Sequence, residues 1–118
     1  MGVAHHASYV PWFEIGRTEL LRKSGISYAS LEAGGLLLVI VGLEVKYRRS
    51  VRYDDVVEIR THWCGGGRVK IQHRYEVVVI ERDGAVCETV AAAASTTLGA
   101  VDRAGKIREL PDWLVWKG

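Results

Sequence analysis

The sequence predicts an α+β fold in which a curved antiparallel sheet wraps around one central helix. Two observations predict it: one stretch with helical spacing opens the chain, and segments that alternate apolar and polar residues follow it. A run of small side chains, Ala91 to Ala94, would let the helix approach the sheet closely. At 118 residues and 48% hydrophobic content, the chain has the size and composition of a single domain over residues 1–118.

The helix is expected from Tyr9 to Ser24, where apolar residues recur at helical spacing. Ser8 is a suitable N-cap, and Pro11 falls in the first turn, where its missing N–H costs little. Gly25 supplies a stop at the C-terminal end of the helix. A shorter helix or turn is expected from Ser27 to Ala33, immediately before two glycines.

Four strands are expected after these helices: the first begins as a continuous apolar run and then alternates, the second and third alternate apolar and polar residues, and the fourth contains the alanine run. They lie at Leu36 to Arg49, Val56 to Trp63, Arg68 to Glu81 and Ala85 to Val101. Glycine turns between consecutive strands favour antiparallel pairing, and Asp83-Gly84 is a strong hairpin signal. A short helix is expected to close the chain between Pro111 and Trp116.

Charge and composition exclude several classes of protein. Sixteen Lys and Arg against 14 Asp and Glu leave a formal net charge of +2, which is too small for a protein that binds nucleic acid or a membrane surface. The longest apolar run, Leu36 to Leu43, is too short to span a membrane. Cys64 and Cys87 form neither a metal-binding spacing nor a secreted disulfide framework, so we expect a cytoplasmic protein in which both are small buried or turn residues.

The glycine run and the histidines of the sequence lack the neighbouring residues that a phosphate loop, a metal site or a catalytic histidine would need. The glycines 65–67 do not form a phosphate loop, because no Gly-Lys-Ser/Thr follows and the next element is a strand. His5 and His6 are adjacent, so their side chains point apart and do not make a metal site by themselves. His73 falls on an apolar strand face, where a hydrogen-bonded core histidine is expected rather than a catalyst.

Three segments of the chain carry a family pattern in the right order. They are Gly2 to Glu19, with Gly-Val-Ala-His-His-Ala-Ser-Tyr, Trp-Phe-Glu and Arg-Thr-Glu within it, then Tyr47 to Asp55, and finally Leu98 to Pro111. Together they resemble the 4-hydroxybenzoyl-CoA thioesterase family of hotdog-fold acyl-CoA thioesterases. The resemblance implies a hotdog fold and a reaction in which acyl-CoA and water give a carboxylic acid and CoA. It implies no cofactor other than the CoA within the substrate, and no metal.

The same resemblance implies assembly as a homodimer or homotetramer. Hotdog proteins join sheets edge to edge, and the apolar segment Leu36 to Leu43 is a suitable joining edge because an unpaired apolar edge would aggregate.

One departure from the family concerns its catalytic Asp, which stands three residues before the glycine that matches Gly2. In this sequence that position would precede Met1, as would the family's first strand. We therefore expect either that the true start lies upstream or that the leader has been lost. The edge of the sheet from Val56 to Trp63, with which that strand would pair, is then expected to be exposed or covered by something else.

The resemblance also implies roles for residues at the start of the helix. Thioester hydrolysis needs a carboxylate and hydrogen-bond donors for the developing oxyanion. By position, His6 would supply a backbone N–H to the thioester carbonyl, and Tyr9 would shape the acyl site. Glu14 is a candidate substitute carboxylate, since other hotdog branches carry theirs on this helix. The alternatives are that His6 only begins the helix and that Glu14 pairs with Arg17 or faces a partner subunit.

Four positive charges, Lys46, Arg48, Arg49 and Arg52, stand within seven positions. Arginine forks suit the phosphates of CoA, so this cluster is the candidate for binding its nucleotide portion. The alternative is a solvated strand end.

Two other functions compete with hydrolysis. One is a hotdog module that binds acyl-CoA without cleaving it. The other, a β-rich nucleic-acid binder, is disfavoured because no aromatic platform motif appears.

Overall fold

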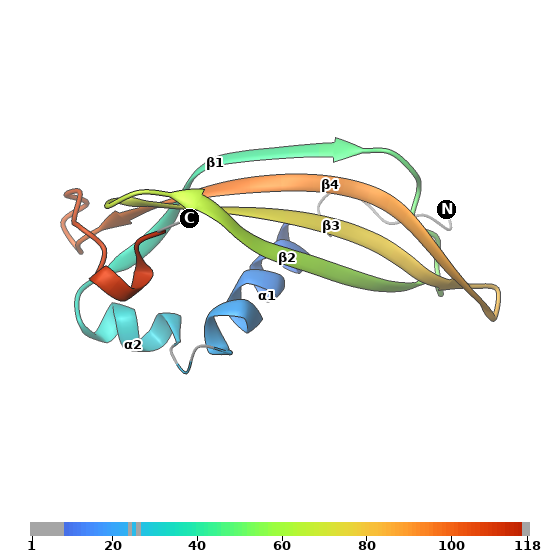
Figure 1. The fold of residues 1–118 in the computed structure, drawn as a ribbon, viewed down its shortest axis with the longest axis horizontal. Coiled ribbons are helices and arrows are strands. Elements are labelled where there is room, and N and C mark those ends of the chain that lie inside the picture. The colour runs from blue at the N-terminus through green and yellow to red at the C-terminus, as the bar shows by residue number, and fades with distance from the viewer. Residues whose placement is uncertain (1–8, 24, 26, 117–118) are drawn as a thin grey trace.

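The computed structural model describes residues 9–23, 25 and 27–116. Two helices, α1 (Tyr9–Arg22) and α2 (Tyr28–Ala33), precede four strands. The strands are β1 (Leu37–Tyr47), β2 (Val56–Gly66), β3 (Lys70–Arg82) and β4 (Ala85–Val101), and the 3-10 helix η2 (Asp112–Leu114) follows them. Figure 1 shows one curved sheet with α1 and α2 on the same side of it. The predicted α+β class is confirmed, with element ends shifted by a few residues.

The four strands form one antiparallel sheet in the order β1-β4-β3-β2. The predicted hairpin joins β3 to β4, and both of its turn residues, Asp83 and Gly84, have positive φ angles of 52° and 77°. Positive φ at both central positions is what a type I′ turn requires, and this turn matches the twist of antiparallel strands. Asp83-Gly84 therefore sets the register in which β3 and β4 pair.

The first part of the core lies between α1 and the middle of the sheet. Phe13, only 1% exposed, packs its ring 4.8 Å from that of Tyr75 on β3. Ala91 and Ala92 on β4 are fully buried in the same cluster, together with Tyr9. The small side chains thus admit the bulky residues of the helix, as the alanine run predicts.

A second close approach joins α1 to β2. A Cβ atom added to Gly16 would overlap the hydroxyl oxygen of Thr61. The absence of a side chain at Gly16 therefore sets how closely the helix lies against β2. Sequence spacing marks Gly16 as part of the apolar helix face but does not reveal this contact.

The second part of the core lies towards the beginning of β3. It gathers six buried residues from the sheet, α2 and the C-terminal segment: Leu31, Ile71, Leu98, Ala100, Leu110 and Leu114.

His73 on β3 is also buried, as expected, but the expectation of a hydrogen-bonded histidine is wrong for one ring nitrogen. Its Nδ1 atom has no hydrogen-bond partner within the described part of the chain, because the strand places the ring among apolar side chains.

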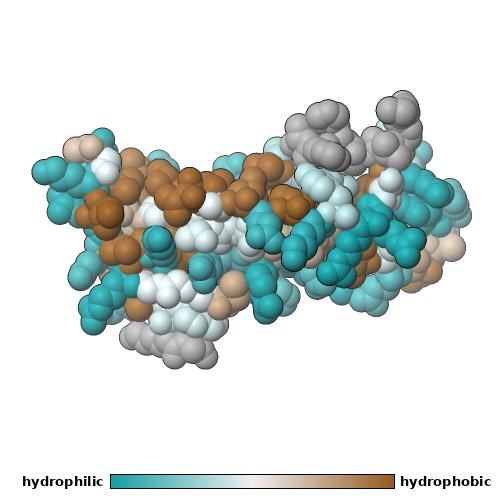
Figure 2. Space-filling view, turned by 90° about the horizontal axis from the view of Figure 1, so that it is seen from above, coloured by the Kyte–Doolittle hydropathy of each residue, from teal (hydrophilic) through white to brown (hydrophobic). Residues whose placement is uncertain are grey.

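The sheet has two edges in the described residues, β1 and β2. β1 exposes several large apolar side chains: Val39, Ile40, Val41, Leu43 and Tyr47. Figure 2, which looks onto the side where β1 lies, shows an apolar band along much of the molecule. At the opposite edge, no strand among the residues that the structure describes pairs with the outer side of β2.

Candidate functional site

Of the predicted residues at the start of α1, the structure describes Tyr9 and Glu14, which lie in different surroundings. Tyr9 is buried in the core, with its ring 5.2 Å from those of Trp12 and Tyr47. Burial, and secondarily Tyr47, raises the pKa of the Tyr9 hydroxyl above its usual value, so the phenol is protonated at neutral pH. Glu14 is exposed and lies on a different side of the helix. His6 lies outside the described residues.

Glu14 lines a cavity of about 140 Å³ between the helices and β1, together with Arg17 and Tyr28. The alternative that Glu14 pairs with Arg17 is wrong for the described structure, since no ion pair joins them. Arg17 is buried whereas Glu14 is exposed, although both line this cavity. The helix does hold an ion pair further on, from Arg22 to Glu19 at 3.0 Å.

The basic residues after β1 divide into two groups. Arg49 and Arg52 line a hollow of about 430 Å³ together with Ser50, Arg82 and Thr89. We call this feature the arginine hollow. Lys46 and Arg48 are not among its lining residues, and the Lys46 ammonium lies 3.7 Å from Glu44. The structure thus brings together two of the four predicted cations and adds a third, Arg82.

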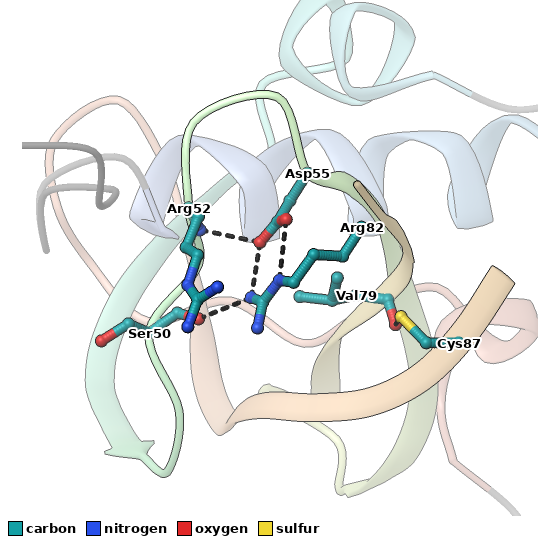
Figure 3. Close-up of polar contacts among 6 residues, drawn as sticks. All are labelled: Ser50, Arg52, Asp55, Val79, Arg82 and Cys87. Carbon is teal, nitrogen blue, oxygen red and sulfur yellow. Dashed lines mark hydrogen bonds and ion pairs between the residues drawn. The ribbon is translucent and has the colours of Figure 1, made fainter. Parts of the chain in front are cut away.

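Local contacts explain how the arginine hollow is built. The backbone N–H groups of Arg48 and Arg49 both donate to the Ala91 carbonyl, at 2.8 and 3.0 Å, which fixes the chain as it leaves β1. Figure 3 shows the Asp55 carboxylate between Arg52 and Arg82. The Arg52 backbone N–H donates to Asp55 Oδ2 at 2.7 Å, so the connection between β1 and β2 closes on itself.

Arg82 is held by a two-pronged ion pair. Its Nε donates to Asp55 Oδ1 at 2.9 Å and its Nη2 to Asp55 Oδ2 at 2.6 Å. The same Nη2 donates to the Ser50 carbonyl at 3.1 Å. Two parallel bonds orient a guanidinium far better than one, so the position of Arg82 in the hollow is fixed.

Electrostatics in the hollow follow from these contacts. The side chain of Asp55 is 2% exposed, and the hydrogen bonds from Arg82, followed by that from the Arg52 backbone, lower its pKa to about 2. Asp55 is therefore ionised at neutral pH and neutralises one of the three arginines. The remaining positive charge favours an anionic ligand such as a phosphate group.

Sequence reasoning missed Arg82 because it stands 30 positions after Arg52 in the chain. The antiparallel topology brings it back, since β3 ends beside the residues from which β2 begins: Val56 pairs with Glu81. The alternation of apolar and polar residues along β2 and β3, together with the end of β3 that Asp83-Gly84 marks, indicates how these two strands pair. Arg82 could have been found by pairing the strands before looking for basic clusters.

The remaining candidates for chemistry have structural roles in the described residues. Cys87 Sγ donates to the Val79 carbonyl at 3.4 Å (Figure 3), and Cys64 Sγ donates to the Gln72 carbonyl at 3.6 Å. Within residues 9–116, apart from 24 and 26, no group of three or more His, Cys, Asp or Glu could hold a metal ion. In the same residues no helix is long and apolar enough to cross a membrane.

A curved antiparallel sheet against one main helix is the hotdog fold of thioesterases. Residues 1–117 match the Thioesterase-like superfamily, and the chain belongs to that superfamily. The chain is similar to the acyl-CoA thioester hydrolase YbgC of Escherichia coli O6:H1, with 42% identity over 60 residues that make up 51% of this chain and 45% of that protein.

Solved structures agree with this assignment. The DHNA-CoA thioesterase of Staphylococcus aureus superposes with a TM-score of 0.82 and 30% identity, covering 96% of this chain and 75% of that one. The protein TT1821 of Thermus thermophilus superposes with a TM-score of 0.80 and 28% identity over 98% of this chain and 81% of that one. The chain spans only 44% and 64% of the length of two curated relatives that it matches, from Bacillus subtilis and Synechocystis sp..

Proposed function

We propose that the protein is an acyl-CoA thioester hydrolase that acts in the cytoplasm and belongs to the 4-hydroxybenzoyl-CoA thioesterase branch of its superfamily. Water and an acyl-CoA react to give a carboxylic acid and free CoA, and the CoA of the substrate is the only cofactor-like group required. A single hotdog domain over residues 1–118 carries the site. The observation that supports this proposal best is the arginine hollow, whose charge suits the phosphates of CoA.

The position of the hollow relative to α1 supports the same reaction. The ring of Tyr9, at the start of α1, lies 5.2 Å from that of Tyr47, which ends β1. Arg49 follows Tyr47 by two positions, so the hollow and the start of α1 lie at the same end of the sheet. A CoA bound in the hollow can extend its thioester arm towards the N-terminal end of α1, where the helix dipole stabilises negative charge.

Within this proposal, His6 supplies a backbone N–H to the developing oxyanion and Tyr9 shapes the wall of the acyl site. Glu14 supplies a carboxylate that activates water, unless an Asp preceding Gly2 does so in a chain extended upstream. Arg49 and Arg52, together with Arg82, bind the phosphates of CoA. Lys46 and Arg48 contribute only to the positive field around that site.

Release of free thiol from a panel of acyl-CoAs tests the proposed reaction. The chain of 118 residues and a chain extended upstream along its gene are assayed side by side, with heat-denatured protein as the background. We expect thiol release above background from at least one of the two. If neither chain releases thiol from any acyl-CoA, the hydrolase proposal is overturned.

A second candidate function is a hotdog module that binds acyl-CoA without cleaving it. One observation favours it: both carboxylate oxygens of Asp55, beside the hollow, are occupied by Arg52 and Arg82 and are therefore not disposed to activate water. This candidate predicts saturable binding of CoA, and thermal stabilisation by it, with no thiol release.

We also propose that the protein assembles as a homodimer or homotetramer through the exposed edge of β1. The apolar side chains along this edge strand support the proposal, because an unpaired apolar edge invites pairing with another strand. No role in nucleic-acid binding is proposed, since the cations of the hollow form a compact pocket rather than an extended basic surface.

A further inference from the structure

A second cavity lies away from the arginine hollow. It has a volume of about 180 Å³ and is bounded by the C-terminal part of α1, by α2, by β1 to β3 and by η2. Figure 1 shows the helices α1 and α2 and the C-terminal segment gathered below the sheet at one end of the molecule. About 30 Å of β3 separates His73, in this cavity, from Arg82 in the hollow. The cavity is therefore separate from the proposed CoA site.

The lining of this cavity is mostly apolar. Three aromatic side chains, Tyr28, Trp63 and Trp113, contribute to it, and leucines with one isoleucine supply most of the rest. The lining contains no Asp, Glu, Lys or Arg side chain. A charged ligand would lose its hydration there and would meet no charged side chain in the lining, so the cavity favours an uncharged one.

His73 is the lining residue with an unpartnered buried polar atom. It is 7% exposed, lines the cavity, and has no hydrogen-bond partner at Nδ1 among the described residues. Burial, and secondarily the nearby charge of Arg17, lowers the pKa of His73 to about 4, so the ring is neutral at pH 7. A buried polar atom without a partner is costly, and a ligand that hydrogen-bonds to it recovers that cost.

The size of the cavity limits the ligand further. An apolar cavity of about 150 Å³ can hold a benzene molecule, so this one has room for a single substituted aromatic ring. Aromatic rings also pack favourably against aromatic walls in edge or offset arrangements.

We propose that this cavity is a binding site for a small uncharged aromatic molecule that carries one hydroxyl or N–H group, and that His73 Nδ1 is the hydrogen-bond partner of that group. The site is independent of thioester hydrolysis and extends the protein's ligands beyond acyl-CoA.

Phenol and benzene are the probes that test the proposal on the full chain. Calorimetric titration should show phenol binding at least tenfold more tightly than benzene. In protein labelled with 15N-histidine, phenol should move the ring-nitrogen resonances of His73 and leave those of His62 unchanged, since His62 is exposed on β2 and does not line the cavity.

Substitutions identify the group responsible. His73→Phe should bring the two affinities together by weakening phenol alone, while the matched variant His62→Phe should keep the tenfold preference. Leu114→Trp, which fills the cavity, should abolish binding of both probes. The proposal is overturned if neither probe binds, if phenol and benzene bind the wild-type protein equally, or if His73→Phe retains the preference. If the variants fail to fold, the His73 nitrogen resonances of the wild-type protein still test the proposal, and resonances that phenol does not move would overturn it.

Discussion

At the scale of single residues, Asp55 joins parts of the chain that are distant in sequence. Its carboxylate accepts from the Arg52 backbone N–H and from two nitrogens of Arg82, and so ties the β1–β2 connection to the end of β3. A buried carboxylate with three donors is strongly stabilised in its charged form. Asp55 thus acts as a positioning residue for the arginine hollow.

This arrangement predicts how stability depends on pH. The pKa of Asp55 falls from 3.8 to about 2 on folding, so its contribution is present above about pH 4 and is lost as the pH falls through 2. Asp55→Asn should lower Tm by several degrees at pH 7 and flatten the decline of Tm between pH 4 and pH 2. Thermal melts across this range measure both effects. The matched control is Asp54→Asn, an adjacent carboxylate that makes none of these contacts. An acid profile unchanged by Asp55→Asn would show that the ion pair contributes nothing to stability.

Gly16 is the second residue with a position-specific role. Gly16→Ala should destabilise the fold by about 1–3 kcal/mol, because the new Cβ overlaps the Thr61 hydroxyl oxygen. The double variant Gly16→Ala with Thr61→Ala should recover most of that loss. Urea denaturation measures the free energies of unfolding, with Gly67→Ala as a control at a site where an added Cβ meets no other atom within 4 Å. Equal stability of wild type and Gly16→Ala would disprove the close approach.

At the scale of secondary-structure elements, β1 combines an edge position with exposed apolar side chains, and this combination predicts an interface between copies. Val41, 58% exposed, is the most exposed of them. In a dimer that pairs through β1, Val41→Lys should raise the dissociation constant about 30-fold or more, the size of an interface hot spot.

Analytical ultracentrifugation measures the change. Val86→Lys is the matched control, because Val86 is 89% exposed at the start of β4 and lies away from the proposed interface. A dimer that Val41→Lys leaves intact would place the interface elsewhere, and a monomeric wild-type protein would overturn the proposed assembly.

The elements also show what the sequence can predict and why. Alternation, apolar runs and turn chemistry predict the four strands of the described residues and the β3–β4 hairpin, because these signals act between neighbouring residues. The helix α1 ends at Arg22 rather than Ser24, and β2 extends past Trp63 to Gly66. The ends of elements depend on tertiary contacts that a local pattern does not contain.

The candidate site was predicted only in part for the same reason. Arg49 and Arg52 are close in sequence, so their clustering is visible there, whereas Arg82 reaches the hollow through strand pairing. Lys46 and Arg48 belong to the same cluster in sequence but do not line the hollow. The unpartnered nitrogen of His73 depends on what packs around it in three dimensions. Roles for Tyr9 and Glu14 remain predictions.

At the scale of the whole molecule, the fold is elongated, with extents of 47 × 25 × 25 Å. The arginine hollow lies where β3 ends, and the apolar cavity with His73 lies where β3 begins. One curved sheet thus carries two chemically different sites. The polar site suits the phosphates of CoA, and the apolar one suits an uncharged ring.

The affinity for free CoA tests the assignment of the arginine hollow most directly, and calorimetry measures it. The double variant Arg49→Glu with Arg52→Glu should raise Kd about 100-fold or more, because each charge-assisted hydrogen bond contributes about 1.5–3 kcal/mol. The variant Lys46→Glu with Arg48→Glu makes the same change in net charge at side chains that do not line the hollow, and should leave Kd within about threefold at physiological salt, where exposed charges are partly screened. Equal losses in the two variants, or CoA binding that neither affects, would contradict the account.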